Sequence, residues 1–190
     1  MRIVSGKFRN KKLEFPKNLK TRPLKDNVRE NIFNILSHSK NIGIEIKNSN
    51  VLDLYAGTGS FGLECISRES SEVVFVENDL DALKNLEKNI KNLDSENKTT
   101  LLAQDVVEFF RILTLELYKE KFNIIFLDPP YENKEFIKVI EIIKKKDLLN
   151  KKHIIVIHRE IKSEDHIDKQ LNIIEKRIYG RSEIFFGRFF

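Results

Sequence analysis

NVLDLYAGTGSFG, residues 50–62, begins as an apolar run and ends in a loop rich in glycine. The apolar half predicts a buried strand, and Gly57, Gly59 and Gly62 fit the spacing G-x-G-x-x-G between a strand and a helix. Glycines at such a turn carry no side chain, so a cofactor can approach the backbone. This segment therefore predicts a nucleotide-like ligand at the carboxyl end of the first strand of an α/β sheet.

Downstream of this segment, apolar runs alternate with helical patterns. The expected strands are Asn50 to Tyr55, Glu72 to Glu77, Thr100 to Ala103, Asn123 to Leu127 and Ile154 to His158. The expected helices are Ser60 to Arg68, Leu80 to Leu93, Val106 to Tyr118 and Lys134 to Lys145. Alternation at this spacing is typical of βαβ units, which predict a mainly parallel sheet covered by helices on both faces.

The carboxyl-terminal segment has a different pattern. Leu171 to Tyr179 and Glu183 to Phe189 predict two strands, and a tight turn that contains Gly180 separates them. Such a pair forms an antiparallel hairpin at the edge of the sheet. The expected fold is therefore α/β, with a mainly parallel sheet of seven strands that ends in an antiparallel hairpin.

The first 40 residues stand apart in charge. They hold 11 basic and 3 acidic side chains, whereas the remaining 150 hold 23 basic and 26 acidic ones. Short apolar runs at residues 2–4 and 12–15 predict a small hairpin, and helical spacing predicts an amphipathic helix from about Lys25 to Ser39. We expect a basic amino-terminal extension, residues 1–40, and a main domain, residues 41–190. A basic segment of this kind indicates an RNA or DNA partner, although solvated surface lysines explain it equally well.

Length and composition narrow the class of protein. A chain of 190 residues suits one compact domain, and its hydrophobic fraction of 41% is enough for a core. The one cysteine, Cys65, excludes an intramolecular disulfide framework and a cysteine-cluster metal site. The apolar runs are too short to span a bilayer, so a cytoplasmic location without a membrane partner is expected.

An acidic residue ends each of the first four predicted strands. Asp53 lies four residues before Gly57, where it could hold a cationic amino group, and Glu77 lies 20 residues after Gly57, where it could accept both ribose hydroxyls. Asp105 could accept a hydrogen bond from an adenine amino group. One such acid alone is equally well a helix cap; four in this order favour a ligand site. The expected cofactor-binding residues are Asp53, Ala56, Gly57, Gly59, Glu77 and Asp105.

The fourth predicted strand is followed by the tetrapeptide DPPY, residues 128–131. A dinucleotide-dependent oxidoreductase would share the glycine spacing, but hydride transfer gives this tetrapeptide no role. With the glycine loop, it resembles the class I S-adenosylmethionine-dependent methyltransferases, and DPPY resembles the motif of their amino-methylating branch. More narrowly, the amino-terminal signature of the RsmD family resembles MRIVSGK at 1–7, TRP at 21–23, and the residues Asp26, Val28, Arg29, Glu30, Phe33, Asn34, Ile35 and Leu36 of this chain.

The resemblance implies a Rossmann-like class I methyltransferase fold, S-adenosylmethionine as cofactor and no metal. It also implies transfer of a methyl group to N2 of a guanine in bacterial 16S ribosomal RNA. The Asp128 carboxylate and the Pro129 carbonyl would accept the two amine hydrogens, Pro130 would restrict the turn, and Tyr131 would stack on an extruded base. DPPY is also found in enzymes that act on other amines. A DNA adenine or cytosine, a protein glutamine amide, or a noncatalytic RNA-binding role therefore remain alternatives.

The expected partner is small-subunit ribosomal RNA or its assembling particle, and the chain is expected to act as a monomer. The expected RNA contacts are the basic side chains Arg2, Lys7, Arg9, Lys11, Lys12, Arg22 and Arg29. For Arg29, an ion pair with Asp26 or Glu30 is an equal alternative. One departure from the family pattern is the sequence HRE at 158–160, where a more acidic segment is expected; no role is predicted for it.

Overall fold

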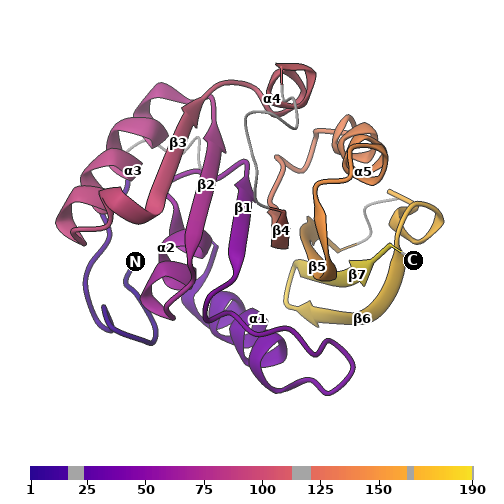
Figure 1. Ribbon diagram of the computed structural model, residues 1–190, viewed down its shortest axis with the longest axis horizontal. Coiled ribbons are helices and arrows are strands. Elements are labelled where there is room, and N and C mark those ends of the chain that lie inside the picture. The colour runs from indigo at the N-terminus through magenta and orange to yellow at the C-terminus, as the bar shows by residue number, and fades with distance from the viewer. Residues whose placement is uncertain (17–23, 113–120, 162–164, 190) are drawn as a thin grey trace.

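The computed structural model describes residues 1–16, 24–112, 121–161 and 165–189. Its strands form one sheet in the order β3-β2-β1-β4-β5-β7-β6 (Figure 1). Strands β1 to β5 are parallel, and β7 runs antiparallel to both of its neighbours, β5 and β6. The strands are β1 (Asn50–Leu54), β2 (Glu72–Glu77), β3 (Thr99–Ala103), β4 (Phe122–Leu127), β5 (Leu149–Glu160), β6 (Asn172–Tyr179) and β7 (Ser182–Arg188). The predicted sheet of seven strands with its antiparallel C-terminal hairpin is confirmed.

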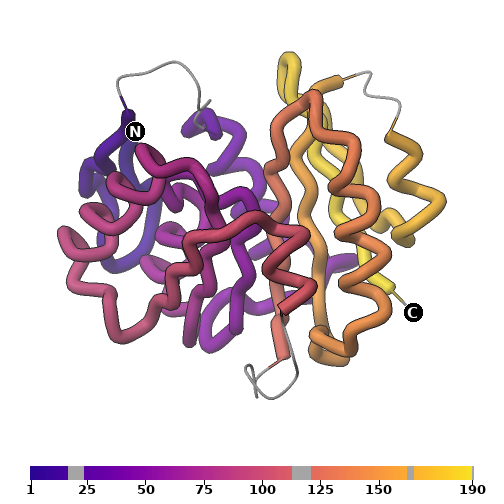
Figure 2. Tube along the Cα trace, turned by 90° about the horizontal axis from the view of Figure 1, so that it is seen from above, coloured from indigo at the N-terminus to yellow at the C-terminus, as the bar shows by residue number. Residues whose placement is uncertain are grey.

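Two hydrophobic clusters lie on the two faces of this sheet. One takes buried residues from α1, α2 and α3, and the other from α4 and α5. Figure 2 shows the amino-terminal residues at one side of the molecule and the C-terminal hairpin at the other. The helices are α1 (Asp26–His38), α2 (Ser60–Ser67), α3 (Leu80–Asn92), α4 (Val106–Ile112) and α5 (Phe136–Lys145), with 3-10 turns η1 (Glu96–Lys98) and η2 (Ile167–Lys169). For the helix predicted to reach Tyr118, residues 113–118 lie outside the described ranges.

Strand β5 is longer than its apolar run predicts. Leu149 pairs with Phe122 before a shift in register, so the strand begins five residues early. At the other end, β7 pairs with β5 as far as Ser182 opposite Glu160. The polar residues 158–160 therefore belong to a strand because their neighbour supplies hydrogen bonds, which an apolar pattern does not reveal. This extension carries β5 into the candidate site.

The predicted amino-terminal hairpin is present but shorter than predicted. Arg2 and Lys12 form an antiparallel bridge, and the N–H groups of Ile3, Asn10 and Leu13 donate to the carbonyls of Lys11, Ile3 and Met1 respectively. The reason is the buried carboxylate of Glu64 in α2, which accepts N–H bonds from Val4 at 2.7 Å and Ser5 at 2.9 Å. The backbone that would extend the hairpin is thus bonded to α2 instead.

The amino-terminal extension shares the hydrophobic core of the main domain. Phe33 of α1 stacks on Phe61 of α2 with ring centroids 5.0 Å apart, and Phe61 stacks on Phe126 of β4 at 4.1 Å. Ile3 and Leu13 belong to the same buried cluster. The boundary near residue 40 stays a prediction, but residues on both sides of it pack together.

We predict that Phe61→Ala lowers the free energy of unfolding by about 3–5 kcal/mol, because it removes the middle ring of this stack and leaves a cavity. Urea unfolding followed by circular dichroism measures this change. Ile178→Ala, at a side chain that is 52% exposed, is the control and should cost less than about 1 kcal/mol. A loss at Phe61 no larger than that of the control would contradict this account of the core.

Candidate active site

Parallel pairing brings the carboxyl ends of four neighbouring strands to one edge of the sheet. Leu54 of β1 pairs with Val76 of β2 and with Leu127 of β4, while Glu77 pairs with Ala103 of β3. In open α/β sheets this edge is where ligands bind. The acidic residues predicted from the strand ends, Asp53, Glu77, Asp105 and Asp128, lie at these positions or within two residues of them, and thus at this edge.

Asp53 is a buried carboxylate that is only half satisfied. Its Oδ2 accepts the N–H of Gly62 at 2.9 Å, and its Oδ1 is buried without a hydrogen-bond partner in the described part of the chain. Burial raises the pKa of Asp53 well above its usual value, and the nearby carboxylates Asp128 and Glu77 raise it further. A cation at Oδ1 would relieve both effects, which supports the predicted contact with a cationic amino group.

Glu77 ties the end of β2 to the glycine loop. Its Oε2 accepts the N–H of Gly57 at 2.7 Å, and its Oε1 accepts those of Asn78 and Asp79, each at 2.8 Å. These bonds fix the carboxylate at the sheet edge. Because each carboxylate oxygen has two lone pairs, the side chain retains acceptor capacity for hydroxyl groups.

The three glycines of the loop do different work. A Cβ at Gly57 would meet nothing within 4 Å, so this residue alone faces open space, as a loop that meets a cofactor must. A Cβ at Gly59 would lie 2.3 Å from Leu86, and one at Gly62 would lie 2.3 Å from the Phe75 ring. Gly59 and Gly62 therefore allow close packing of the loop and α2 against the core, and their contact with a cofactor stays a prediction.

The remaining predicted cofactor residues lie in the same region. Ala56 accepts the N–H of Gly59 at 2.8 Å inside the loop. Asp105 is exposed and its Oδ1 accepts the N–H of Val107 at 2.8 Å, so it caps the start of α4. The capping interpretation of Asp105 is thus observed, and its contact with an adenine stays a prediction.

Asp128 lies beside a histidine that the sequence analysis left without a role. Its side chain is 22% exposed, and its Oδ1 lies 2.8 Å from Nδ1 of His158. Leu127 pairs with Ile157, so the next residue on each strand stands beside the other. Knowledge of the strand register would have identified His158, because the residue after Ile157 on β5 reaches the same edge of the sheet as the residue after Leu127 on β4.

A second residue missed by the sequence analysis, Arg159, holds the loop of residues 129–131. Its guanidinium is buried and donates to the carbonyls of Pro129 at 3.3 Å, Pro130 at 3.0 Å and Tyr131 at 2.9 Å. Asp165 neutralises it through a 2.7 Å ion pair. The loop backbone is therefore fixed by one planar group that bonds several carbonyls at once. The Pro129 carbonyl keeps one lone pair for a further donor.

The two ends of the tetrapeptide differ in exposure. Pro129 is buried and Pro130 is exposed, while Tyr131 is half-buried. The Tyr131 ring meets the His158 ring edge-on, with centroids 6.0 Å apart and an interplanar angle of 78°. The four predicted catalytic residues, Asp128, Pro129, Pro130 and Tyr131, are thus brought together with the predicted cofactor residues at one edge.

The predicted RNA contacts do not all share this edge. Arg29 is fully buried and pairs with Asp26 at 2.9 Å, and burial lowers its pKa. Its predicted contact with RNA is therefore wrong, because a phosphate cannot reach a side chain enclosed in the core, and the ion-pair alternative is observed. Arg22 lies outside the described residues. The exposed members of the predicted set are Arg2, Lys7, Arg9, Lys11 and Lys12.

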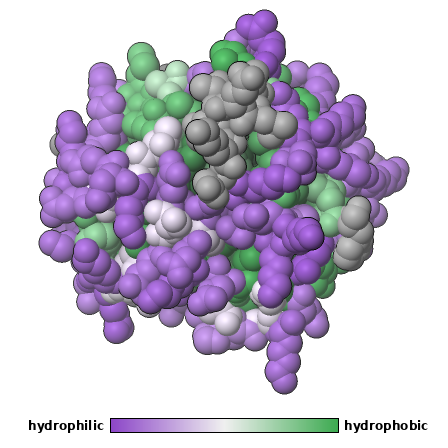
Figure 3. Space-filling model, in the orientation of Figure 1, coloured by the Kyte–Doolittle hydropathy of each residue, from purple (hydrophilic) through white to green (hydrophobic). Residues whose placement is uncertain are grey.

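The segment that carries these exposed basic residues contacts the far end of α2 at Lys7. The backbone N–H of Lys7 donates to the carbonyl of Ser67 at 2.7 Å, and Ser67 is the last residue of α2. The glycine loop precedes the first residue of α2, which is eight residues long, so the helix separates the loop from Lys7 by about 12 Å. The segment then returns toward the loop, because the Asn89 side chain donates to the carbonyls of both Glu14 and Thr58, each at 3.1 Å. Hydrophilic side chains dominate the face drawn in Figure 3, with smaller hydrophobic patches between them.

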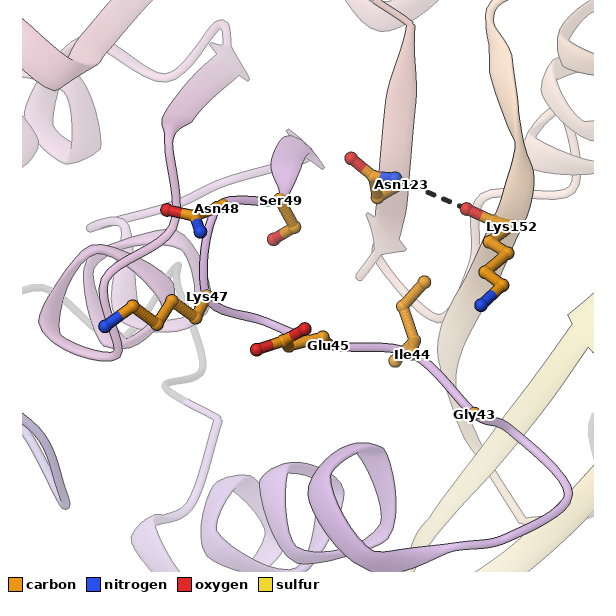
Figure 4. A pocket seen from close by; sticks show the side chains of 8 residues that line it. All are labelled: Gly43, Ile44, Glu45, Lys47, Asn48, Ser49, Asn123 and Lys152. Atoms are coloured by element: carbon orange, nitrogen blue, oxygen red, sulfur yellow. Dashed lines mark hydrogen bonds between the residues drawn. The ribbon is translucent and has the colours of Figure 1, made fainter.

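A hollow of about 360 Å³ lies at the opposite edge of the sheet (Figure 4). Segment 43–49 before β1 lines it together with Asn123 and Lys152, and the Asn123 amide donates to the Lys152 carbonyl at 3.3 Å. These residues lie at the starts of β1 and β4 and early in β5. The hollow therefore belongs to the amino ends of the strands and not to the candidate site.

No helix in the described ranges is both long and apolar enough to cross a membrane. In the same ranges, no group of three or more His, Cys, Asp or Glu side chains is placed to hold a metal ion.

Comparison with known proteins agrees with this geometry. A family model described as conserved hypothetical protein 95 matches residues 1–188. Ribosomal RNA small subunit methyltransferase D of Buchnera aphidicola (subspecies Acyrthosiphon pisum) is 31% identical over 187 residues, which cover 96% of this chain and 90% of the relative. The yhhF structure of Escherichia coli, provisionally assigned as a methyltransferase, is 25% identical, with a TM-score of 0.82 and 99% and 97% coverage of the two chains.

A more distant structure shows the fold alone. SMU.776, solved with S-adenosylhomocysteine, is 13% identical with a TM-score of 0.63, covering 82% of this chain and 49% of the other. The predicted Rossmann-like fold of the class I methyltransferases is confirmed by these structures. S-adenosylmethionine is the cofactor that this class of methyltransferases implies.

We predict that Asp53→Asn has opposite effects on cofactor affinity and on stability. Loss of the charge should weaken binding of S-adenosylhomocysteine by about 10- to 100-fold, because a hydrogen bond to a charged group contributes about 1.5–3 kcal/mol. The ligand-free variant should be more stable at neutral pH, since a neutral amide avoids the cost of burying a charge. Calorimetric titration and thermal unfolding measure the two effects.

The pH dependence of stability checks the same residue. A carboxyl whose folded-state pKa is raised binds its proton more tightly when folded, so the wild-type protein loses stability as pH rises from the ordinary aspartate pKa through the folded one. The Asn variant should lack this loss. Equal pH profiles for the two proteins, together with unchanged affinity, would contradict the role given to Asp53.

Proposed function

We propose that this chain, which belongs to the family described as conserved hypothetical protein 95, methylates N2 of a guanine in 16S ribosomal RNA. The membership confirms the resemblance to the RsmD family. The choice of substrate is supported by relatives that carry the name ribosomal RNA small subunit methyltransferase D, including one from Escherichia coli K12 that is 29% identical over 163 residues. The observation that carries the proposal is the Asp128 carboxylate, part-exposed and held at the sheet edge on a clamped loop.

The residues at the edge fit S-adenosylmethionine. The unpartnered Oδ1 of Asp53 suits its ammonium group, and Glu77 suits its ribose hydroxyls. Leu80 lies three residues after Glu77 with 71% of its surface exposed, and it offers an apolar contact for adenine. Gly57 leaves room for close approach to the backbone. When bound, the cofactor supplies an electrophilic methyl group on a sulfonium.

The chain's own residues then act on the guanine amine. The exocyclic nitrogen is a poor nucleophile because its lone pair is delocalised into the ring. The Asp128 carboxylate would accept one of its hydrogens and the free lone pair of the Pro129 carbonyl the other, which turns the nitrogen lone pair out of the ring plane. Holding the amine in this orientation supplies most of the rate enhancement. After transfer, the extra proton on nitrogen leaves to Asp128 or to water.

The target base must leave its stack to reach this edge. Extrusion of a guanine is least costly from a loop or an unpaired position. The Tyr131 ring and the exposed Pro130 would then contact the base, and stacking on an aromatic ring contributes about 1–3 kcal/mol. The basic residues of the amino-terminal segment would bind phosphates, and because this segment runs between the far end of α2 and the glycine loop, the RNA would extend along it.

We predict that Asp128→Ala lowers methyl transfer by about 100-fold or more, because the group that accepts the amine hydrogen is gone. S-adenosylhomocysteine affinity should stay within about twofold, since Asp128 follows β4 and lies outside the cofactor loop. Asp147→Ala is the control, at an exposed surface pair with Lys121. The measurement is transfer of radiolabelled methyl groups to unmethylated 16S RNA, small-subunit particles, duplex DNA and a glutamine-bearing protein, each alone.

Each outcome of that assay has a definite meaning. Transfer to 16S RNA or to the particle supports the proposed function, and transfer only to DNA or protein overturns the substrate class. Binding of RNA without any product would identify a noncatalytic module. Full activity in the Asp128 variant would remove Asp128 from the mechanism.

We also predict that Arg159→Lys lowers methyl transfer by about 100-fold, because a lysine ammonium lacks the planar fork with which the guanidinium reaches three loop carbonyls and Asp165, and a shift of about 1 Å in the loop is this costly. Its affinity for S-adenosylhomocysteine should be unchanged. Arg111→Lys, at an exposed pair with Glu108 in α4, is the matched control. Activity of the Arg159 variant equal to that of the control would show that the loop keeps its shape without the clamp.

A further inference from the structure

We propose that His158 and Ser182 form a positioning pair that sets the orientation of the Asp128 carboxylate. Nδ1 of His158 lies 2.8 Å from Oδ1 of Asp128, and because a carboxylate oxygen only accepts, we assign Nδ1–H as the donor. The Ser182 hydroxyl oxygen lies 2.9 Å from His158 Nε2, so in this tautomer the hydroxyl donates to Nε2. This leaves Oδ2 of Asp128 for the substrate amine. The inference rests on the proposed function for the role of Asp128 and adds the residues through which that role is made specific.

The three side chains come from three strands that meet at one edge. Asp128 follows β4, His158 lies near the end of β5, and Ser182 begins β7. The register places Glu160 opposite Ser182 and His158 opposite Ile184, so the start of β7 runs beside the end of β5. The C-terminal hairpin, which the sequence predicted only as an edge element, thus contributes a side chain to the site.

Burial makes this chain of hydrogen bonds specific. The His158 side chain is 8% exposed, so water competes little for its ring nitrogens. The Tyr131 ring meets it edge-on and limits rotation of the imidazole. A buried imidazole with a carboxylate on one nitrogen and a hydroxyl on the other adopts the tautomer that satisfies both. That tautomer has its proton on Nδ1.

The orientation of Asp128 follows from this tautomer. With Oδ1 engaged by Nδ1–H, one rotamer of the carboxylate is favoured over the others. No donor within the described residues bonds its Oδ2, and the side chain is part-exposed. Oδ2 is therefore the acceptor presented to the substrate. His158 touches neither the amine nor the cofactor in this arrangement, so it acts through Asp128.

Four variants separate this role from simple support of the fold. Asn at 158 places an amide N–H near the position of Nδ1, whereas Gln places it near Nε2. We expect His158→Asn to keep kcat within about fivefold of wild type, and His158→Gln and His158→Ala to lose about 10- to 100-fold. We expect Ser182→Ala to lose about three- to tenfold. The KM for S-adenosylmethionine should stay within about twofold in all four, and His38→Asn, at an exposed position, is the control.

A spectroscopic readout tests the pair without any RNA. Long-range proton–nitrogen NMR correlation of the imidazole rings identifies the tautomer of each histidine, and His158→Asn assigns the His158 signals. We expect the neutral Nδ1–H tautomer in wild type and a shift toward Nε2–H in Asp128→Ala. An Nε2–H tautomer in wild type would overturn the inference.

Failure of the inference and failure of the proposed function are distinguishable. A wild-type protein that methylates none of the RNA substrates overturns the proposed function, whereas the tautomer still reports on His158. Equal kcat in His158→Asn, His158→Gln and His158→Ala overturns the inference even if the wild type methylates 16S RNA.

Discussion

The parallel pairing of β4 with β5 is the constraint on which the site depends. Leu127 lies opposite Ile157, so Asp128 and His158 leave their strands side by side. One residue further on, Arg159 turns its guanidinium under the loop that follows Asp128. A slip of one residue in this register would exchange the two faces of β5 and remove both contacts. The packed apolar run of β5 fixes the register, and thereby the chemistry.

The same edge carries a cost in stability. Burial raises the pKa of Asp53, the nearby carboxylates of Asp128 and Glu77 raise it further, and one Asp53 oxygen has no partner in the described residues. Such groups destabilise a fold unless a ligand uses them, and proteins tolerate them where function requires it. The buried Arg159 shows the opposite arrangement, since Asp165 and the loop carbonyls satisfy its donors. The donors of Arg159, which support the site, are thus hydrogen-bonded, whereas Oδ1 of Asp53 is left without a partner in the described residues.

The sequence predicts the sheet, the glycine loop and the strand-end acids because these depend on local patterns. Apolar periodicity identifies strands, and the order of strand and helix fixes their direction. These sequence patterns fail where a residue distant in the sequence decides the local structure. Glu64 in α2 accepts the backbone N–H bonds that a longer amino-terminal hairpin would need. Arg29 is basic in sequence, yet its helix turns it into the core.

His158 and Arg159 show the same limit from the other side. They are polar residues at the end of an apolar run, and only the pairing of β7 with β5 keeps them in a strand. Knowledge of which strand neighbours β4 would have assigned them to the site. The roles of the glycines likewise can be read only from the packed core, because a Cβ at Gly59 would clash with Leu86 whereas one at Gly57 would meet nothing within 4 Å.

The central claim is that this edge presents a hydrogen-bond acceptor to the exocyclic amine of a guanine. Mass spectrometry of nucleosides, after digestion of unmethylated 16S RNA incubated with the protein and S-adenosylmethionine, tests it most directly. The account predicts N2-methylguanosine as the new nucleoside. A product methylated on a ring carbon, a ribose hydroxyl or another base would contradict it.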